Sequence, residues 1–280
     1  MINTIILSWT TFIYFAAFVF YLVRMVSGKE LWGRMGTATA LIGLFAHTAA
    51  LILRWIASYQ IGIGHAPLSN LYESLIFFAW SIVALYLVIE WRTKNRSLGT
   101  FVVPVAFLSM AFASLSPNIS SRIQPLIPAL QSNWLTTHVI TCFLGYAAFT
   151  VAFALGLMAL LKGMEHENRA KSHRFISLIP EVGILDELIY RSVVLGFVFL
   201  TIGIMTGSIW AHYAWGSYWS WDPKETWSLI TWLVYAIMLH ARYVRGWRGK
   251  RMAVMAIVGF ISVLITYFGV NYLPGLHSYQ

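Results

Sequence analysis

Charged residues are scarce in this sequence. Lys, Arg, Asp and Glu together make up 10% of the 280 residues, whereas hydrophobic residues make up 59%. Soluble domains carry about 25% charged residues. So low a charged fraction over this length excludes an ordinary soluble domain, and it indicates that most of the chain lies in a lipid bilayer.

Cysteine is almost absent. The one cysteine, Cys142, lies inside an apolar run. A single thiol excludes a disulfide framework, a cysteine-based zinc site and a CxxC redox pair within this chain. If the function involves thiols, another protein must supply them.

Acidic residues are also few, with 10 Asp and Glu against 19 Lys and Arg, so the net charge is +9. Basic loops on the inner side of a membrane, in contact with anionic lipid, account for this excess. We therefore expect no nucleic-acid partner. The first apolar run has no basic residue before it and is longer than the core of a signal peptide, so we expect it to be a retained span.

Apolar runs long enough to cross a bilayer recur along the whole sequence. There are eight of them, at about 2–23, 35–55, 71–89, 98–115, 135–161, 192–209, 226–241 and 252–270. They predict an all-α protein, a polytopic transmembrane helical bundle of about eight spans. With no internal repeat in the sequence, residues 1–280 are expected to form a single membrane domain.

The distribution of Lys and Arg predicts the orientation. If both termini are on the outer side, periplasmic or lumenal, all but three of the 19 basic residues fall in the inner segments. The exceptions are Arg54, Arg122 and Lys224. Positively charged loops stay on the inner side, so we expect both termini outside. The inner segment 162–191 mixes both signs of charge, and we expect it to lie on the surface as a helix.

Tryptophan is concentrated in one outer segment. Six of the 13 lie within 210–232: Trp210, Trp215, Trp219, Trp221, Trp227 and Trp232. An aromatic belt at the membrane interface explains the last two readily. Trp215, Trp219 and Trp221 fall in a short predicted loop with Gly216, and this arrangement favours a platform for a flat apolar ligand over a simple belt.

The end of this loop has the pattern of a helix start. Asp222 is an acidic N-cap, Pro223 occupies the first helical position and Glu225 the third. We expect Asp222 to cap the seventh span, and a second role in ligand binding is compatible with this. Asn70 and Glu73 predict a similar cap for the third span.

Four histidines are candidates for function. His138 begins the fifth span and His277 follows the eighth, both on the predicted outer side with the tryptophans. Two imidazoles beside an aromatic platform suit a bis-histidine haem site, and two unrelated interfacial histidines are the alternative. His240 and His47 lie deeper within spans, where an ionisable residue marks either a functional site or a buried hydrogen bond. Function is favoured for His240, and both alternatives stay open for His47.

Longer motifs resemble a known family. The pattern Trp215-Gly216-x-x-Trp219-x-Trp221-Asp222-Pro223-Lys224-Glu225 resembles the WWD motif of the haem-handling superfamily. The stretches His65-Ala-Pro-Leu-Ser-Asn-Leu-Tyr-Glu-Ser74, Trp134-Leu-Thr-Thr-His138 and Gly275-Leu-His-Ser-Tyr279 are similar to the CcsA (ResC) subunits of System II cytochrome c synthases. The resemblance covers about residues 40–280, with the WWD loop at 210–227.

The resemblance implies a function in cytochrome c biogenesis. Such a subunit binds haem b, conveys it to the outer membrane face and presents it to the CxxCH segment of apocytochrome c for thioether attachment. It works with a CcsB (ResB) partner, in a bacterial inner membrane or a thylakoid membrane. A haem exporter without attachment chemistry is the alternative, so whether the chain is an enzyme, as part of a holocytochrome c synthase, stays open.

The resemblance also implies residue roles. By motif match, His138 and His277 are the outer axial ligands of haem iron, and His240 is the ligand within the membrane. Trp215, Gly216, Trp219, Trp221 and Asp222 form the platform. The second ligand within the membrane is expected on the partner, which weakens the case for His47. No protein nucleophile is implied, and catalysis is expected to consist of positioning.

Overall fold

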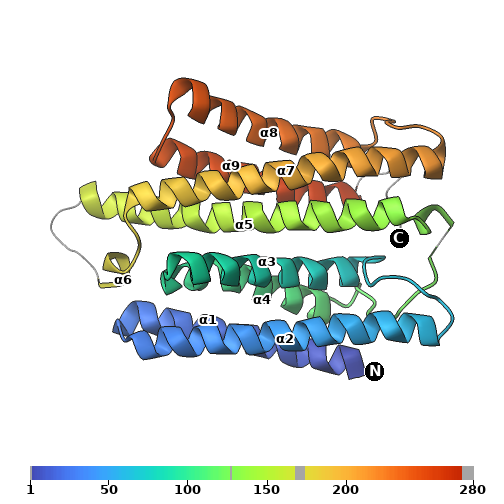
Figure 1. Cartoon of the computed structure of the whole chain (residues 1–280), viewed down its shortest axis with the longest axis horizontal. Coiled ribbons are helices and arrows are strands. Elements are labelled where there is room, and N and C mark those ends of the chain that lie inside the picture. Colours follow the sequence, from blue (N-terminus) through green and yellow to red (C-terminus); the bar gives the residue numbers. More distant parts are fainter. Residues whose placement is uncertain (1, 127, 168–173, 273–280) are drawn as a thin grey trace. The chain divides into compact units, whose positions relative to one another are not determined.

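The structure, a computed structural model, describes residues 2–126, 128–167 and 174–272. These residues form helices joined by turns and loops, without a β-strand among them (Figure 1). The α-helices are α1 (Ile2–Ser27), α2 (Glu30–Gln60), α3 (Leu71–Thr93), α4 (Gly99–Leu115), α5 (Asn133–Glu167), α6 (Arg174–Ser177), α7 (Val182–Trp215), α8 (Pro223–Arg245) and α9 (Lys250–Tyr267). Short 3-10 helices are η1 (Arg96–Leu98), η2 (Pro128–Leu130) and η3 (Gly269–Tyr272). The all-α prediction is confirmed.

Seven helices in the described part of the chain are long and apolar enough to cross a membrane. They are α1, α2, α3, α4 with its preceding η1, α5, α7 and α9, so this is a multi-pass membrane protein. The predicted span at 226–241 lies within α8, which is not among the seven. Helix α8 carries Lys224, Glu225, Arg242 and Arg245, which lower its apolar character. The count of eight spans and the outer position of the termini stay predictions.

The expectation of a surface helix over residues 162–191 is wrong. Helix α5 continues to Glu167 and α7 already begins at Val182, with the four-residue α6 between them. Starting a new helix requires a costly first turn, whereas extending an existing helix adds one backbone hydrogen bond for each residue. The charged residues of this segment therefore lie largely on helix extensions, where Arg191 pairs with Glu187 one turn away.

The chain divides into two compact units. Unit 1 comprises residues 1–127 and 168–180, and unit 2 comprises residues 128–167 and 181–280. Unit 1 therefore contains α1 to α4 and α6, and unit 2 contains α5, α7, α8 and α9. The single membrane domain stays a prediction.

In unit 1, glycines allow α1 and α2 to pack closely as an antiparallel pair (Figure 1). A Cβ atom on Gly36 would lie 2.9 Å from the ring of Tyr21, and one on Gly43 would lie 2.7 Å from the ring of Tyr14. Small residues at such contacts are the usual means by which membrane helices approach each other. The aromatic side chains of α1 thus fill space that α2 leaves open.

A buried ion pair joins α2 to the start of α3. Arg54 Nε lies 2.7 Å from Glu73 Oε1, and both side chains are 1% exposed. The other Glu73 oxygen accepts hydrogen bonds from the backbone and hydroxyl of Ser69. Asn70 accepts from the Glu73 backbone at 2.9 Å, which confirms the predicted cap. The Glu73 carboxylate is therefore bound to Arg54 and Ser69.

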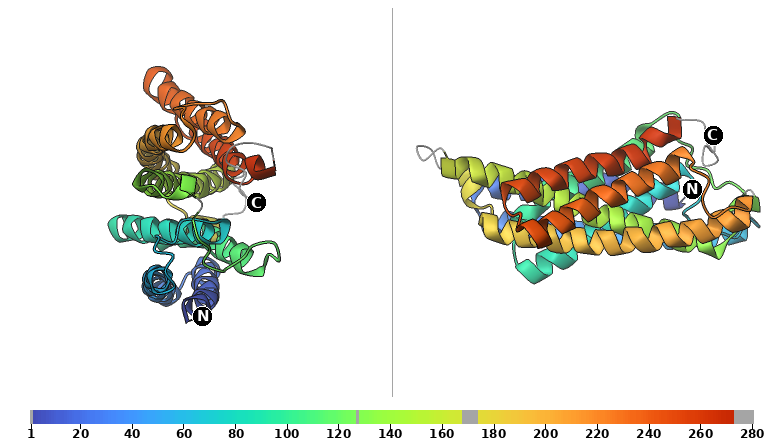
Figure 2. Two further views of the ribbon diagram at one scale, coloured as in Figure 1. Left: turned by 90° about the vertical axis from the view of Figure 1, so that its right-hand side faces the viewer. Right: turned by 90° about the horizontal axis from the view of Figure 1, so that it is seen from above.

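In unit 2, α5 and α7 pack along their length, and α9 and α8 complete the group (Figure 2). A Cβ atom on Gly145 of α5 would lie 3.1 Å from the Gly196 carbonyl oxygen of α7. Gly196 in turn leaves room for Phe149, whose ring stacks on Tyr235 of α8 at 3.6 Å between centroids. The glycine seam between α5 and α7 thus positions the aromatic layer on which α8 packs.

The Arg54–Glu73 pair makes the stability of unit 1 sensitive to one charge. Glu73→Gln leaves the Arg54 guanidinium buried without a counter-charge, and we expect the free energy of unfolding to fall by about 3–5 kcal/mol. Arg191→Gln is the matched control, since its pair with Glu187 is exposed and contributes little. Thermal unfolding of the purified protein in detergent measures the loss of stability in both variants. Equal decreases in unfolding temperature in the two variants would contradict a special contribution of the buried pair.

Candidate functional site

The structure distributes the predicted site residues between the two units. His138, His240 and the tryptophan segment belong to unit 2, whereas His47 belongs to unit 1. His277 lies outside the described residues. The assigned roles can therefore be compared with geometry at His138, His240, His47 and the tryptophan segment.

The loop itself is shorter than the 210–227 segment assigned to it from sequence. Helix α7 includes Trp210 and His212 and extends to Trp215. It ends because Gly216 adopts a left-handed conformation (φ 78°) and donates its backbone N–H to the His212 carbonyl. The loop proper runs from Gly216 to Asp222, and Trp215 belongs to the last turn of the helix.

Glu225 orders this loop from the first turn of α8. Its Oε2 accepts hydrogen bonds from the Ser220 backbone at 2.7 Å, the Ser220 hydroxyl at 3.1 Å and the Asp222 backbone at 3.3 Å. Asp222, 7% exposed, accepts from the Lys224 backbone at 2.8 Å, and the predicted capping box is confirmed. The contact with Ser220 was missed from sequence, although the capping-box pattern placed Glu225 beside the loop.

The loop holds its aromatic residues at a conformational cost. Trp221 has φ 59° and is 69% exposed. For a bulky side chain the left-handed region costs roughly 1–2 kcal/mol, and such strain concentrates at functional sites. The ring of Trp221 meets that of Trp219 edge to face, with centroids 5.8 Å apart.

Trp219 contributes a polar atom as well as a ring. Its indole Nε1 is buried and has no hydrogen-bond partner in the described part of the chain. Buried donors are almost always paired, so an unpaired one indicates a missing acceptor. A ligand with an oxygen acceptor would satisfy it.

His138 is held on α5 by the backbone of α7. Its Nδ1 lies 2.6 Å from the Gly203 carbonyl oxygen. A carbonyl can only accept, so Nδ1 carries the proton and the lone pair of the neutral ring is on Nε2. For Nε2 no hydrogen-bond partner occurs among the described residues. This tautomer is the one that a metal-ligating histidine commonly adopts.

Aromatic contacts connect His138 to the loop. The His138 ring stacks on Trp210, with centroids 6.2 Å apart and planes at 19°. Trp210 meets Trp215 at 4.8 Å in an edge-to-face contact. The imidazole and the start of the tryptophan loop therefore lie at the same end of unit 2, which the sequence predicted only through shared membrane depth.

Two glycines of α7 make room for this arrangement. A Cβ atom on Gly207 would lie 2.5 Å from His138 Nδ1, and one on Gly203 would lie 2.5 Å from the Cys142 sulfur. Sequence reasoning missed both residues. Their spacing of four in an apolar helix was the available signal, because it places them on one face of the helix.

His240 lies far from this end, about 25 Å along α8 at 1.5 Å per residue. Its side chain is exposed on the helix surface. The neighbouring Arg242 is buried and pairs with Asp186 of α7 at 2.7 Å, and Asp186 also accepts from the Gly249 backbone at 2.7 Å. The end of α8 is therefore anchored to α7 while the imidazole of His240 faces away from the unit.

His47 shows the structural alternative that the sequence left open. It is fully buried, and its Nδ1 lies 3.1 Å from the hydroxyl of Tyr14 on α1. Its Nε2 is buried without a partner in the described ranges. A hydrogen bond that joins α1 to α2 accounts for its position, and a role as haem ligand stays a prediction.

Comparisons with known proteins place the chain in a family. The model of the family described as "Cytochrome C assembly protein" matches residues 68–277. The cytochrome c biogenesis protein CcsA of Pyropia yezoensis is 41% identical over 94% of this chain and 92% of its own length. The CcsA proteins of Marchantia polymorpha and Gloeobacter violaceus are 39% and 37% identical, over 98% and 94% of this chain and 94% and 91% of their own lengths.

The chain belongs to the CcsA family. The resemblance to CcsA subunits is thus confirmed, and the CcsA-family assignment makes this a protein of cytochrome c biogenesis. A solved structure named cytochrome c heme lyase CcmF matches with a TM-score of 0.69 at 18% identity, over 95% of this chain. This match shows a shared fold, and the chain spans 46% of the length of that protein.

The ordering of the loop from Gly216 to Asp222 by Glu225 can be tested directly. Glu225→Ala removes the acceptor for the Ser220 and Asp222 amides, and loss of such a capping interaction costs about 1 kcal/mol, or about fivefold in a local opening equilibrium. We expect hydrogen exchange at these two amides to accelerate by about that factor.

Glu181→Ala is the matched control for the exchange experiment. Glu181 likewise lies at the start of a helix of unit 2, as the N-cap of α7, but its side chain forms no capping bond there. Its replacement should leave exchange in the loop unchanged. If Glu225→Ala also leaves exchange unchanged, the loop is ordered by other contacts.

Proposed function

We propose that this CcsA-family protein binds haem b as its substrate and presents it at the outer membrane face to the CxxCH segment of apocytochrome c. One observation carries the proposal. His138, with its lone pair on Nε2, lies beside Trp210, which contacts Trp215 at the start of the WWD loop. This arrangement supports the proposal, because an imidazole nitrogen able to ligate iron and two tryptophan rings lie at one end of unit 2.

The residues present fit a porphyrin with acidic side groups. His138 Nε2 would ligate the iron, and the exposed Trp221 ring offers an apolar face, with the Trp219 ring nearly perpendicular to it. The unpaired Trp219 Nε1 would donate to a propionate oxygen. His277 is proposed as the second axial ligand, on the motif match alone.

The chain's contribution to the reaction is to bind and orient. Haem supplies two vinyl groups, and attachment adds the S–H of each substrate cysteine across one vinyl double bond, with no atom lost. Fixing two reactants in a reactive geometry can supply several kcal/mol of rate enhancement. Glu225 orders the loop through its hydrogen bonds to Ser220 and Asp222, and the Gly203 carbonyl orients the His138 ring.

His240 is proposed as a ligand on the route of haem from the inner side. Its exposed position on α8 leaves the imidazole open to a group from outside unit 2. A CcsB-type subunit would supply the second ligand at this position. We propose that this complex lies in a bacterial inner membrane or a thylakoid membrane.

The contact between Gly207 and His138 yields a sharp test of the ligand assignment. Gly207→Ala would place a methyl group 2.5 Å from His138 Nδ1 and displace the ring from the Gly203 carbonyl. Overpacking of this kind costs about 1–3 kcal/mol, so we expect haem binding to weaken by about tenfold or more. Gly183→Ala on the same helix is the control, because its Cβ meets nothing within 4 Å. Equal haem affinity in both variants would contradict the assignment.

Thioether formation distinguishes a synthase subunit from a haem exporter. The chain is reconstituted with its CcsB-type partner in vesicles, and a CxxCH peptide or an SxxSH control peptide is supplied on the outer side. We expect haem to become covalently attached to the CxxCH peptide alone, and less so with His138→Ala. Haem delivery to the outer side without covalent product would instead indicate the exporter.

A further inference from the structure

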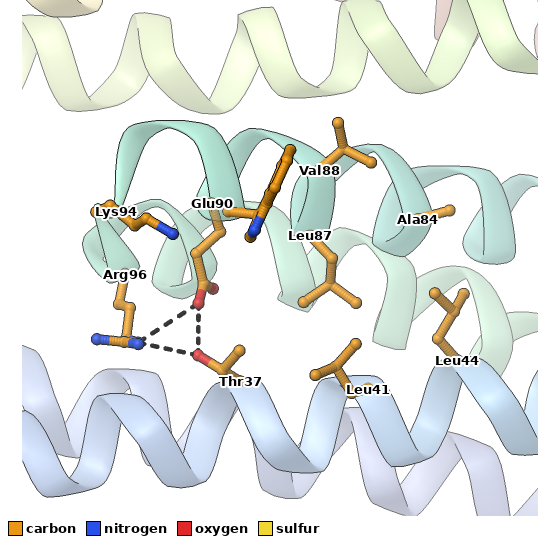
Figure 3. Close-up of a pocket in the computed structure, with 10 residues that line it drawn as sticks. Thr37, Leu41, Leu44, Ala84, Leu87, Val88, Glu90, Lys94 and Arg96 are labelled. Atoms are coloured by element: carbon orange, nitrogen blue, oxygen red, sulfur yellow. Dashed lines mark hydrogen bonds and ion pairs between the residues drawn. The ribbon is translucent and has the colours of Figure 1, made fainter.

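A groove unrelated to the tryptophan loop lies in unit 1, between α2 and α3. Its volume is about 480 Å³, within the range of about 300–1,000 Å³ typical of small-molecule sites. It is lined by Thr37, Leu41, Leu44, Ala84, Leu87, Val88, Glu90, Trp91, Lys94 and Arg96. Figure 3 shows the polar residues gathered at one end, with the aliphatic residues extending away from them along both helices.

The acidic residue at the polar end is already satisfied. Glu90 accepts hydrogen bonds from the hydroxyls of Tyr21, Tyr86 and Thr37, and it lies 3.5 Å from Arg96 Nε. The guanidinium of Arg96 also pairs with Glu30. The protein itself therefore neutralises the Glu90 carboxylate and supplies its hydrogen bonds, so Glu90 does not require a partner from a ligand in the groove.

Lys94 supplies a second positive charge at this end. It ends α3 in a left-handed conformation and forms no ion pair with any described residue, while its ammonium lies 5.7 Å from the centre of the Trp91 ring. Arg92, which is also exposed on α3, does not line the groove. Because Arg96 and the three hydroxyl groups satisfy Glu90, Lys94 leaves the polar end of the groove positive.

The apolar part of the groove is open to its surroundings. Leu41 is 39% exposed, Val88 51% and Trp91 68%. Both flanking helices are long and apolar enough to span a membrane, so lipid is the expected medium beside these side chains. The ligand that suits a positive end and an aliphatic body is an anionic amphiphile.

We propose that this groove binds one anionic membrane lipid, with its headgroup on Lys94 and an acyl chain along Leu41, Leu87 and Val88. Basic pockets between membrane helices characteristically bind anionic headgroups. Haem fits less well, because the lining contains no His, Met, Cys or Tyr to ligate iron. The site goes beyond the proposed function and does not depend on it.

Lipid binding can be measured on the full-length protein by native mass spectrometry. The detergent-solubilised chain is titrated with dioleoyl phosphatidylglycerol or with phosphatidylcholine of the same chains. We expect preferential binding of phosphatidylglycerol. Lys94→Gln should weaken it about fivefold, the effect of removing one cation near a headgroup. Ala84→Phe, which fills the apolar part, should weaken binding of this lipid as well, and Lys94→Arg should preserve it.

Arg92→Gln is the matched control, since it removes the same charge from the same helix without lining the groove. It should leave binding unchanged. Equal binding of the two lipids by the wild type would overturn the proposal. An equal loss of lipid affinity in Arg92→Gln and Lys94→Gln would also overturn it, because it would indicate diffuse attraction to the protein surface. Displacement of the lipid by stoichiometric haem would overturn it as well.

Discussion

The close approach of α5 and α7 is the constraint on which the proposed site depends. Without side chains at Gly203 and Gly207, the backbone of α7 comes close enough for the Gly203 carbonyl to accept from His138 Nδ1. That single hydrogen bond sets the position of the imidazole and the nitrogen that keeps its lone pair. The same helix continues to Trp215, so the spacing that positions the ligand also positions the start of the aromatic loop.

Buried charges secure the helix ends in both units. Arg54 and Glu73 join α2 to α3, and Arg242 and Asp186 join α8 to α7. Ion pairs inside an apolar bundle contribute little net stability but make each partner costly to lose. The ion pairs therefore determine which helix ends lie together. In unit 2, the Arg242–Asp186 pair anchors the part of α8 that carries the exposed His240.

Much of the fold followed from the sequence, because apolar runs and capping patterns depend on nearby residues. Seven of the predicted spans and the Asp222 cap are examples. Features that depend on contacts between distant residues were missed, such as the Gly203 carbonyl at His138 and the Tyr14 hydroxyl at His47. The helical position of Trp215 was missed because a glycine C-cap and a loop glycine look alike in sequence. The family came from the resemblance of several motifs, including the stretches at 65–74 and 134–138, and no spacing argument could have supplied it.

The proposed ligation of haem iron by His138 Nε2 beside the tryptophan loop is open to a direct spectroscopic test. The most direct measurement is the absorption spectrum of the purified complex for the wild type and His138→Gly, with and without added imidazole. The account predicts sharp low-spin bands in the wild type, their loss or weakening in the variant, and their recovery when imidazole occupies the vacated position. An unchanged spectrum in His138→Gly, or the absence of haem from the wild-type complex, would contradict it.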